Sequence, residues 1–511
     1  MIFMVNQYLM ELNSGVEYAE INRQRLLRHY KIPSKIVTRD YNSALHRNME
    51  ILNLEDRDVV NLYDYFQETE SVPSKFLRSN DLNWSYEYAV EQGANYSRVT
   101  EGDHVVADIN FAAGTFGRVD HVDYYDAYNH IVKKDWFDWR GFKSAEEYLT
   151  PVGETLAKFY LKLDGSHAIE EYYMQTGDGQ TVVSLLKLID YHGEDYNFDN
   201  RDELFTFFLD EINQEAGSNS IVIADRPVET NSPVLNMKTS VHKFISIPIL
   251  HGLDRANQDR GQLDSVYYEA LVQRSNELDG VIVMTEAQKK DLNKILNHPS
   301  FPIFVIPGNS ISSKQQKLDL IPMSDRKANK AIFVGRLGVE KQVDLLIRAF
   351  GLVHNDVPNA SLDIYGYGDT TVVNQLNELI SELGLVQQIK VKGFEHNLDD
   401  IYNQAQVFIS ANHEDAMPMA MIDALGHGLP VVTFSDNYGP SEIIDSHHNG
   451  ILLNDGDVLG MAESIVHLFT NAQDLQEYSN DAYNIYKKYG DRVVIKQWKN
   501  MIETEKTLGK N

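Results

Sequence analysis

The sequence contains no cysteine. Without thiols the chain can form neither a disulfide nor a thiolate metal site, which suits a cytoplasmic protein. The chain also has no run of apolar residues long enough to span a bilayer. Residues 1–5 are apolar and carry no basic leader. We therefore expect them to form a first strand and not a signal peptide.

Basic residues are scarce. The chain has 46 Lys and Arg against 75 Asp and Glu, which gives a formal charge of −29. Grooves that bind nucleic acids are basic, so we expect no nucleic-acid partner. A polyanionic acceptor or an anionic membrane surface is disfavoured for the same reason, although a local basic patch is compatible with this balance. The expected location is cytoplasmic, with at most peripheral membrane contact.

The length of 511 residues favours two or three domains. Short apolar runs alternate with helical patterns near both ends of the chain, as in mostly parallel α/β sheets. We predict an N-terminal Rossmann-like domain from residues 1–67 and 196–312, interrupted by an antiparallel β module at 68–195. A second Rossmann-like domain is expected at 325–485, followed by a C-terminal helix at 486–511.

The expected β module is rich in aromatic residues. Val105, Ala107 and Ile109 alternate with other residues as they do in strands, and Asp164-Gly165 suits a hairpin turn. An aromatic surface here could hold a peptide or a sugar. Aromatic side chains that fill a small β core are the favoured interpretation.

Three motifs of the first domain follow expected strands. Ser14 and Glu17 have the spacing of a capping box and predict a helix to about residue 29. Thr285 and Gln288 have the same spacing and predict a second box. His251 comes directly after a strand, where it would either face a cleft or serve as a structural loop histidine.

Residues 412–430 combine a strand end, an acidic loop and a helix that begins near Pro418. Asp415 and Asp423 are separated by seven residues, so one carboxylate lies in the loop and the other in the helix. Open α/β sheets bind ligands outside the carboxyl ends of their strands. The helix N-terminus adds free N–H groups and the positive end of a dipole.

Residues 335–342 follow the first strand of the second domain and carry two cations, Arg336 and Lys341. At the carboxyl edge of a sheet, such a pair suits a diphosphate, which Arg binds as a fork and Lys as a point charge. The alternative is a pair of solvated surface cations. Their position in the expected crevice favours the first interpretation.

Together these motifs resemble a known family. Gly335-Arg336-Leu337, Tyr365-Gly366-Tyr367-Gly368, Lys392-Gly393-Phe394, the acidic loop and helix, and Gly428-Leu429-Pro430 look like the retaining nucleotide-sugar glycosyltransferases of family 4. The first domain resembles the GtfA-type protein O-glycosyltransferases, which modify serine-rich adhesins. Serine–aspartate-repeat and teichoic-acid α-glycosyltransferases are related. The resemblance implies the α/β GT-B fold, with two facing Rossmann-like domains and a β-rich insertion in the first.

The resemblance also implies roles for individual residues. Arg336 and Lys341 would hold the UDP diphosphate, His251 would touch the transferred sugar, and Asp415 would contact the hexose. Asp423 would bind the ribose hydroxyls. The other expected donor-binding residues are Ser14, Gly15, Val16, Glu17, Tyr18, Glu395, His396, Glu414, Ala416, Met417 and Pro418. No metal or other cofactor is expected.

The acidic pair departs from the family pattern. The family has glutamate, seven residues and glutamate, whereas this chain has Asp415 and Asp423, with Glu414 offset by one. Either the shorter aspartate draws the loop closer to the sugar, or Glu414 takes its place. Ala416 stands where the family usually has glycine after the first acid, and Met417 and Pro418 follow it, which narrows the expected sugar pocket.

The favoured function is the transfer of a hexose, N-acetylglucosamine or glucose, from a UDP-sugar to Ser or Thr hydroxyls of a serine-rich surface protein, with retention. Its partners would be the UDP-sugar, the acceptor protein, and a second glycosyltransferase-like subunit or a further copy of the chain. One alternative is an α-glycosyltransferase of wall teichoic acid. The other is a non-catalytic acceptor-binding subunit of a glycosyltransferase complex.

Overall fold

The computed structural model describes residues 1–317, 319–413, 415–436 and 438–508. The chain forms two compact units. The first contains Met1–Asn13 and Pro33–Val241, and the second contains Ser14–Ile32 and His242–Asn511. Each unit combines segments that are distant in the sequence.

The first unit contains a parallel sheet. Its strands are β1 (Ile2–Asn6), β2 (Ser34–Thr38), β3 (Val59–Asn61) and β14 (Ser220–Ala224), in the order β14-β1-β2-β3. The sheet is accompanied by α2 (Leu45–Ile51), α3 (Leu62–Phe66), α4 (Arg201–Glu215) and α5 (Pro227–Leu235). Every residue of β1, β3 and β14 is buried, as expected for strands covered on both faces.

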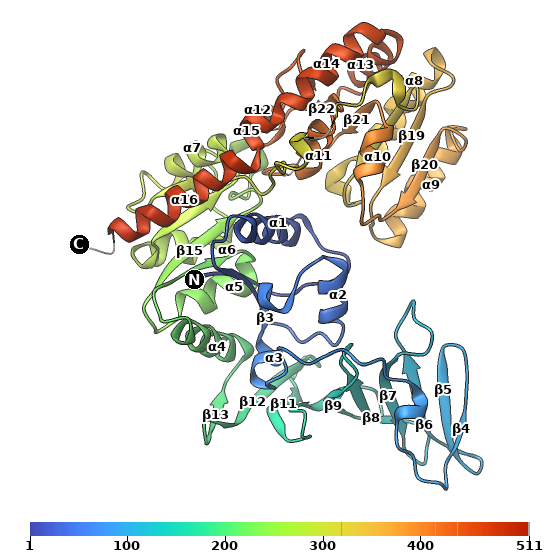
Figure 1. The fold of residues 1–511 in the computed structure, drawn as a ribbon, viewed down its shortest axis with the longest axis vertical. Coiled ribbons are helices and arrows are strands. Elements are labelled where there is room, and N and C mark those ends of the chain that lie inside the picture. Colours follow the sequence, from blue (N-terminus) through green and yellow to red (C-terminus); the bar gives the residue numbers. More distant parts are fainter. Residues whose placement is uncertain (318, 414, 437, 509–511) are drawn as a thin grey trace. The chain divides into compact units, whose positions relative to one another are not determined.

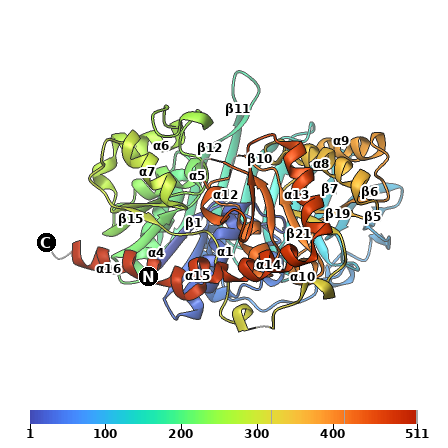
Figure 2. The same ribbon diagram turned by 90° about the horizontal axis from the view of Figure 1, so that it is seen from above.

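Ten antiparallel strands follow one another between β3 and β14, which confirms the expected β-rich insertion (Figure 1). They are β4 (Ala89–Glu91), β5 (Tyr96–Glu101), β6 (His104–Phe111), β7 (Val119–Tyr125), β8 (Ile131–Phe137), β9 (Lys143–Leu149), β10 (Thr155–Leu161), β11 (His167–Gln175), β12 (Thr181–Tyr191) and β13 (Glu194–Phe198). The predicted hairpin at Asp164-Gly165 joins β10 to β11. The longer hairpin of β11 and β12 projects from the sheet (Figure 2).

One face of this sheet carries a continuous row of charges. Directly opposite residues on β4 to β11 are Glu91, Arg98, Asp108, Asp123, Lys134, Glu147, Lys158 and Glu171, which we call the charged row. Residues opposite each other in antiparallel strands lie on the same face and interact. Arg98 pairs with Asp108 at 2.9 Å, and Lys134 pairs with Asp123 at 2.9 Å.

Aromatic side chains have mixed roles in the insertion. Lys158 of the charged row lies over the ring of Tyr41 at 4.7 Å and over that of Trp136 at 5.2 Å. The Trp136 N–H donates to Glu147 at 2.9 Å. Tyr124 packs against the small apolar core on the opposite face, whereas Tyr128 is 81% exposed at a turn. Core packing therefore explains the position of Tyr124 but not that of the exposed Tyr128.

The second unit begins with α1 (Gly15–His29) and continues with β15 (Val241–Ile247), β16 (Gly280–Val283) and β17 (Ile303–Val305). Neighbouring strands in the order β15-β16-β17 are parallel. Between them lie α6 (Ser265–Tyr268), a π-helical segment at Glu269–Gln273, and α7 (Glu286–Ile295). The predicted capping box of Ser14 and Glu17 is present at the start of α1.

The second predicted capping box is only half correct. The Thr285 hydroxyl accepts a hydrogen bond from the Gln288 N–H at 3.2 Å, as the spacing predicts. The Gln288 side chain does not return to Thr285, however. It accepts from the Met284 N–H at 3.1 Å and donates to the Ile249 carbonyl at 2.7 Å. The Gln288 side chain instead satisfies the main-chain groups of Met284 and Ile249, because buried polar groups need hydrogen-bond partners.

The rest of the second unit is built on a six-stranded parallel sheet of order β20-β19-β18-β21-β22-β23. The strands are β18 (Lys330–Val334), β19 (Ser361–Tyr365), β20 (Ile389–Gly393), β21 (Val407–Ser410), β22 (Val431–Phe434) and β23 (Gly450–Leu453). The helices are α8 (Val343–Asp356), α9 (Thr370–Glu382), α10 (Asp399–Gln404), α11 (Met419–Gly426), α12 (Pro440–Ile443), α13 (Val458–Thr470), α14 (Ala472–Ala482), α15 (Tyr486–Tyr489) and α16 (Asp491–Leu508).

Alternation along these strands gives the sheet two buried faces. Ala331 and Phe333 join a core cluster with α8, α9 and α13, whereas Ile332 joins a cluster with α10, α11 and α12. Phe408 and Val431 face the second cluster, and their neighbours face the first. Helices therefore cover both faces, which explains the continuous apolar runs of the sequence.

Glycines bring the loops after the strands into direct contact. Gly366, after β19, has φ +144°, and a Cβ there would lie 1.8 Å from the Gly335 carbonyl oxygen after β18. Leu337 N–H donates to the Tyr367 carbonyl at 2.7 Å, and Gly366 N–H donates to the Gly393 carbonyl at 2.8 Å. The close approach therefore depends on residues without a side chain.

We predict that Gly366→Ala lowers the free energy of unfolding by about 3 kcal/mol or more, because it adds a backbone clash to an unfavourable φ. Gly384→Ala is the matched control. Gly384 has φ +71° and nothing within 4 Å of its added Cβ, so only the conformational cost of about 1 kcal/mol applies. Denaturant midpoints compare the two variants. Equal shifts would contradict the close approach.

Candidate active site

The candidate site lies at the point where the order of the six-stranded sheet reverses. β18 is the central strand, with β19 on one side and β21 on the other. Chain connections leave such a switch point in opposite directions, which opens a crevice at the strand ends. The loop after β18 carries Arg336 and Lys341, and the loop after β21 carries Asn412 and Asp415. The sheet order thus brings the two predicted motifs to one place.

An ion pair closes this switch point. Lys341 Nζ donates to Asp415 Oδ2 at 2.7 Å, and Asn412 Nδ2 donates to the same oxygen. The side chains of Lys341 and Asp415 are 13% and 32% exposed. The His413 N–H also donates to the Glu340 carbonyl at 3.4 Å. The predicted diphosphate cation and the predicted sugar-contacting acid are therefore direct partners.

Arg336 is more accessible than Lys341. Its side chain is 55% exposed and pairs with Glu340, four residues further on. Gly338 makes room for this pair, since a Cβ there would lie 2.2 Å from a Glu340 carboxylate oxygen. An exposed pair of this kind contributes little to stability. The guanidinium can therefore leave Glu340 for a phosphate at small cost.

Asp423 lies on α11 and is connected to α1. Asn309 Nδ2 donates to Asp423 Oδ1 at 2.7 Å, and Asn22 Nδ2 donates to Asn309 Oδ1 at 3.1 Å. Burial raises the pKa of Asp423 to about 6, although the hydrogen bond from Asn309 acts in the opposite direction. This carboxylate is thus held in place but poorly solvated, and further hydroxyl donors would stabilise its charge.

The start of α1 approaches α11. Glu17 accepts hydrogen bonds from the Ser14 N–H at 2.8 Å and from the Ser14 hydroxyl at 2.6 Å. The side chains of Ser14 and Glu17 are therefore both engaged in capping α1. Gly15 is exposed, and a Cβ there would lie 3.8 Å from Met419 Cε. Val16 N–H donates to the Ser14 hydroxyl at 3.3 Å. The main chain of Gly15 is therefore the part of this turn that can approach an anion.

His251 is fully buried and neutral. Its Nε2 lies 2.9 Å from the Gln258 carbonyl and so carries the proton, and burial lowers the pKa of the ring. Nδ1 is buried and has no hydrogen-bond partner in the part of the chain that is described. The ring stacks on Tyr438, with centroids 6.2 Å apart. This arrangement leaves Nδ1 as an acceptor for a hydroxyl.

The residues after β20 form an exposed aromatic group. Glu395 and His396 are both exposed, and the His396 ring meets Phe394 edge-on at 4.8 Å. Phe394 in turn lies 5.8 Å from Tyr367. Tyr18 is half-buried, and its pKa is raised by burial and by the nearby Tyr367. The rings meet edge to face, so they form no common plane, but a single ring face of this group is of the kind on which a nucleobase can stack.

Ala416, Met417 and Pro418 are buried. Ala416 and Met417 belong to the core cluster beneath α11. Gly439 has φ +53°, and a Cβ there would lie 2.5 Å from Pro418 Cδ and 3.1 Å from the Ala416 carbonyl oxygen. Only the main chain of this segment is therefore placed to meet a ligand. Glu414 lies outside the described residues.

Several residues that the sequence did not single out support the site. Asn412 and Asn309 fix the two aspartates, and Gln258 closes the loop after His251 by accepting from the His251 and Gly252 N–H groups. Glu442 accepts from the Glu286 and Ala287 N–H groups at the start of α7. Asn412 could have been found from the sequence, because it lies three residues before the predicted acid Asp415. Asn309 and Glu442 could not, because their partners are more than 100 residues away in the sequence.

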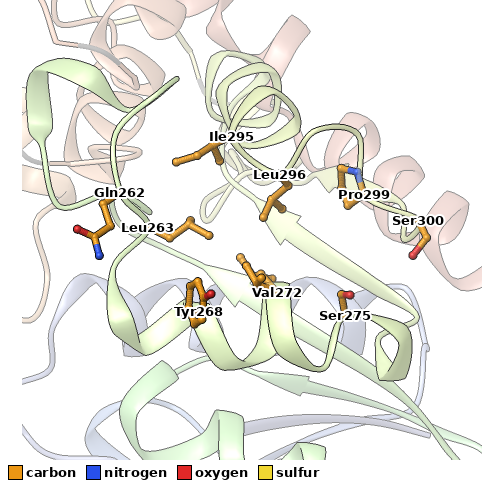
Figure 3. A pocket seen from close by; sticks show the side chains of 10 residues that line it. Gln262, Leu263, Tyr268, Val272, Ser275, Ile295, Leu296, Pro299 and Ser300 are labelled. Carbon is orange, nitrogen blue, oxygen red and sulfur yellow. The ribbon is translucent and has the colours of Figure 1, made fainter.

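An apolar hollow of about 400 Å³ lies elsewhere in the second unit, between the π-helical segment and α7 (Figure 3). The side chains of Leu263, Val272 and Leu296 point into it. Its lining is Gln262, Leu263, Tyr268, Leu271, Val272, Ser275, Ile295, Leu296, Pro299 and Ser300, none of which is charged. The hollow is therefore unsuited to a diphosphate and shares no residue with the predicted site.

Two family models match the chain. The model described as "Glycosyl transferases group 1" matches residues 316–485, and a model of an accessory Sec system protein matches residues 6–343, more than half of the chain. The "UDP-N-acetylglucosamine--peptide N-acetylglucosaminyltransferase GtfA subunit" of Streptococcus gordonii is 26% identical over 521 residues, which cover 98% of each chain. The chain belongs to the family of this accessory Sec system model and to the GtfA-type retaining glycosyltransferases.

Two further comparisons agree with this assignment. The crystal structure of the pneumococcal O-GlcNAc transferase GtfA in complex with UDP and GlcNAc has a TM-score of 0.85, with 23% identity and 98% of each chain covered. The poly(ribitol-phosphate) α-N-acetylglucosaminyltransferase of Staphylococcus aureus (strain COL) is 23% identical over 98% of this chain and 99% of that protein. The GT-B fold implied by the motifs is thereby confirmed.

The raised pKa of Asp423 gives a stability test. Because the folded state holds this proton more tightly than the unfolded chain, the carboxyl lowers stability as pH rises from 3.8 through about 6. We predict that Asp423→Asn raises the free energy of unfolding at pH 8 by about 3 kcal/mol. The gain should vanish below pH 3.8. Denaturant unfolding at both pH values measures it, and a loss of stability at pH 8 would contradict the prediction.

Proposed function

We propose that the chain transfers N-acetylglucosamine from UDP-N-acetylglucosamine to serine and threonine hydroxyls of a serine-rich surface protein, with retention of the anomeric configuration. Glucose is the alternative donor sugar. The observation that carries the proposal is the pairing of Lys341 with Asp415 across the switch point of the sheet. The printed name of the Streptococcus gordonii relative supports the choice of sugar and of a peptide acceptor.

The geometry suits a nucleoside diphosphate leaving group. A donor diphosphate would take Lys341 from Asp415 and Arg336 from Glu340, and both cations would stabilise the charge that develops on UDP. The released Asp415 carboxylate could then accept a hydrogen bond from a sugar hydroxyl. The N–H groups at the start of α1 would add partial positive charge.

The remaining contacts of the donor follow from the same arrangement. Asp423 would accept hydrogen bonds from the two ribose hydroxyls, which favours its ionised form, so donor affinity should fall as pH drops through about 6. The Tyr367, Phe394 and His396 rings would meet the uracil, and Nδ1 of His251 would accept from the sugar. We propose that no metal takes part. In the described residues, no group of three or more His, Asp or Glu side chains is placed to hold one.

A second candidate is glycosylation of wall teichoic acid. The Staphylococcus aureus relative, whose name gives poly(ribitol-phosphate) as its acceptor, matches almost the whole chain. The formal charge of −29 disfavours a polyphosphate acceptor, because like charges repel the incoming chain. We therefore rank the peptide acceptor first.

We further propose a second glycosyltransferase-like subunit as a partner, since the relative from Streptococcus gordonii is itself called a subunit. A cytoplasmic location is also proposed, since the cysteine-free chain depends on no disulfide. None of the helices in the described ranges has both the length and the apolar character needed to cross a membrane.

The two cations give a direct test. We predict that Lys341→Ala and Arg336→Ala each lower turnover about 100-fold or more, because each removes charge from the departing diphosphate. Arg348→Ala, an exposed cation on α8, is the matched control and should remain active. UDP release is followed in buffer with EDTA, and circular dichroism confirms folding. A fully active double variant of Arg336 and Lys341 would refute the assignment.

An acceptor panel decides between the candidate functions. The protein, with and without a partner subunit, is offered UDP-N-acetylglucosamine or UDP-glucose together with a serine-rich peptide, poly(ribitol phosphate) or no acceptor. We expect a mass increase of one N-acetylhexosamine on the peptide alone. Transfer only to the polyphosphate would favour the teichoic-acid function. Release of no UDP under any condition would favour a binding subunit.

A further inference from the structure

A second hollow, of about 630 Å³, has an unusual lining for so acidic a chain. It lies where the end of α1, the segment 313–317 and the start of α16 meet. Its lining residues are His29, Tyr30, Ser313, Lys314, Lys317 and Arg492. Four of these six carry basic side chains and none is acidic, although the chain has 75 acidic residues against 46 Lys and Arg.

The basic side chains of this hollow are accessible. His29, Lys314, Lys317 and Arg492 are all exposed. Within the described ranges, none of the four forms an ion pair. Elsewhere many cations are paired, as Lys134 is with Asp123 and Lys341 is with Asp415. The cations of the hollow are therefore available to a ligand.

Asp491, the carboxylate next to Arg492, is buried and engaged by its neighbours. Asp491 is only 4% exposed and accepts from the Ser313 N–H at 2.9 Å and from the Ser313 hydroxyl at 2.6 Å. Burial raises the pKa of Tyr30, as does the charge of Asp491, while Arg492 acts in the opposite direction. The Tyr30 hydroxyl also donates a hydrogen bond to Asp491, so the phenol stays neutral and its proton is already engaged.

Further cations surround the hollow. Lys31 follows Tyr30, and Lys496 lies one helical turn after Arg492. Lys499 Nζ is 5.8 Å from the centre of the Tyr30 ring. These cations come from α1 and α16, which are in contact although they are far apart in the sequence (Figure 1). The positive charge is thus assembled by the fold and is not a local run.

We propose that this hollow binds a phosphate-bearing anion. Arg492 would hold two phosphate oxygens as a fork, Lys314 and Lys317 would act as point charges, and the neutral Tyr30 side chain would form part of the wall. The site is distinct from the donor site, because α1 presents Gly15 at one end and His29 at the other, about 20 Å away. The phosphate belongs either to a small soluble anion or to a lipid headgroup.

A bound anion would connect three segments of the second unit. Lys314 and Lys317 precede β18, Arg492 begins α16, and His29 ends α1. A ligand that binds only the folded state stabilises it in proportion to its concentration. Binding at this hollow should therefore be visible as a rise in melting temperature as well as in direct titration.

The first test titrates inorganic phosphate and pyrophosphate into the full chain at low ionic strength, with excess UDP present to occupy the donor site. Calorimetry and thermal melting are the readouts. Lys314→Ala/Arg492→Ala should weaken binding at least 10-fold and remove the thermal shift, since two of the cations that hold the anion are lost. The control Lys238→Ala/Lys290→Ala, which removes the same charge from exposed positions elsewhere, should bind as the parent does.

The second test separates the two sources of the phosphate. Sedimentation with vesicles of phosphatidylglycerol, against vesicles of phosphatidylcholine, reports binding to a headgroup. If the parent protein binds the soluble anions and the Lys314→Ala/Arg492→Ala variant does not, the ligand is a soluble anion. Binding to anionic vesicles alone, lost in the same variant, supports a lipid headgroup. If neither probe binds, or if the pocket and control variants bind equally, the proposal is wrong.

Discussion

The ion pair between Lys341 and Asp415 is the interaction on which the candidate site depends. It joins the two loops that leave the sheet on either side of its switch point. The Lys341 and Asp415 side chains are only 13% and 32% exposed to solvent. Two opposite charges held this close satisfy each other, so neither is left buried without a partner. An incoming diphosphate therefore does not have to create a positive site. In the proposed binding mode, the diphosphate would exchange one anionic partner of Lys341 for another and free the Asp415 carboxylate in the same step.

Much of the fold could be predicted from the sequence because its signals are local. Apolar runs at strand spacing, the capping box at Ser14 and the hairpin turn at Asp164-Gly165 each report on a few neighbouring residues, and each appears in the structure. The glycine-rich motifs were equally informative. Gly366 and Gly368 are required where two strand-end loops touch, because an added Cβ would meet the carbonyl oxygens of Gly335 and Leu337, and this need explains why the motif is recognisable.

The remaining features depend on long-range contacts. The partner of Asp423 is Asn309, and the N–H groups at the start of α7 are taken by Glu442; nothing near these residues in the sequence indicates either pairing. The failed half of the second capping box has the same origin, because Gln288 meets main-chain groups beyond β15 that only the fold brings within reach. Local spacing thus identifies candidate residues, whereas tertiary contacts decide which partner each one takes.

The charged row of the inserted sheet has a consequence for how that sheet assembles. A shift of any one strand by a single residue would move its charge to the opposite face, where Val99, Ala107 and Val122 form an apolar core. Misaligned pairings are therefore penalised from β4 to β11, and the charged row helps to set the register of these eight strands. The sheet also ends in short strands, three residues in β4 and five in β13, which offer little edge for an unintended neighbour.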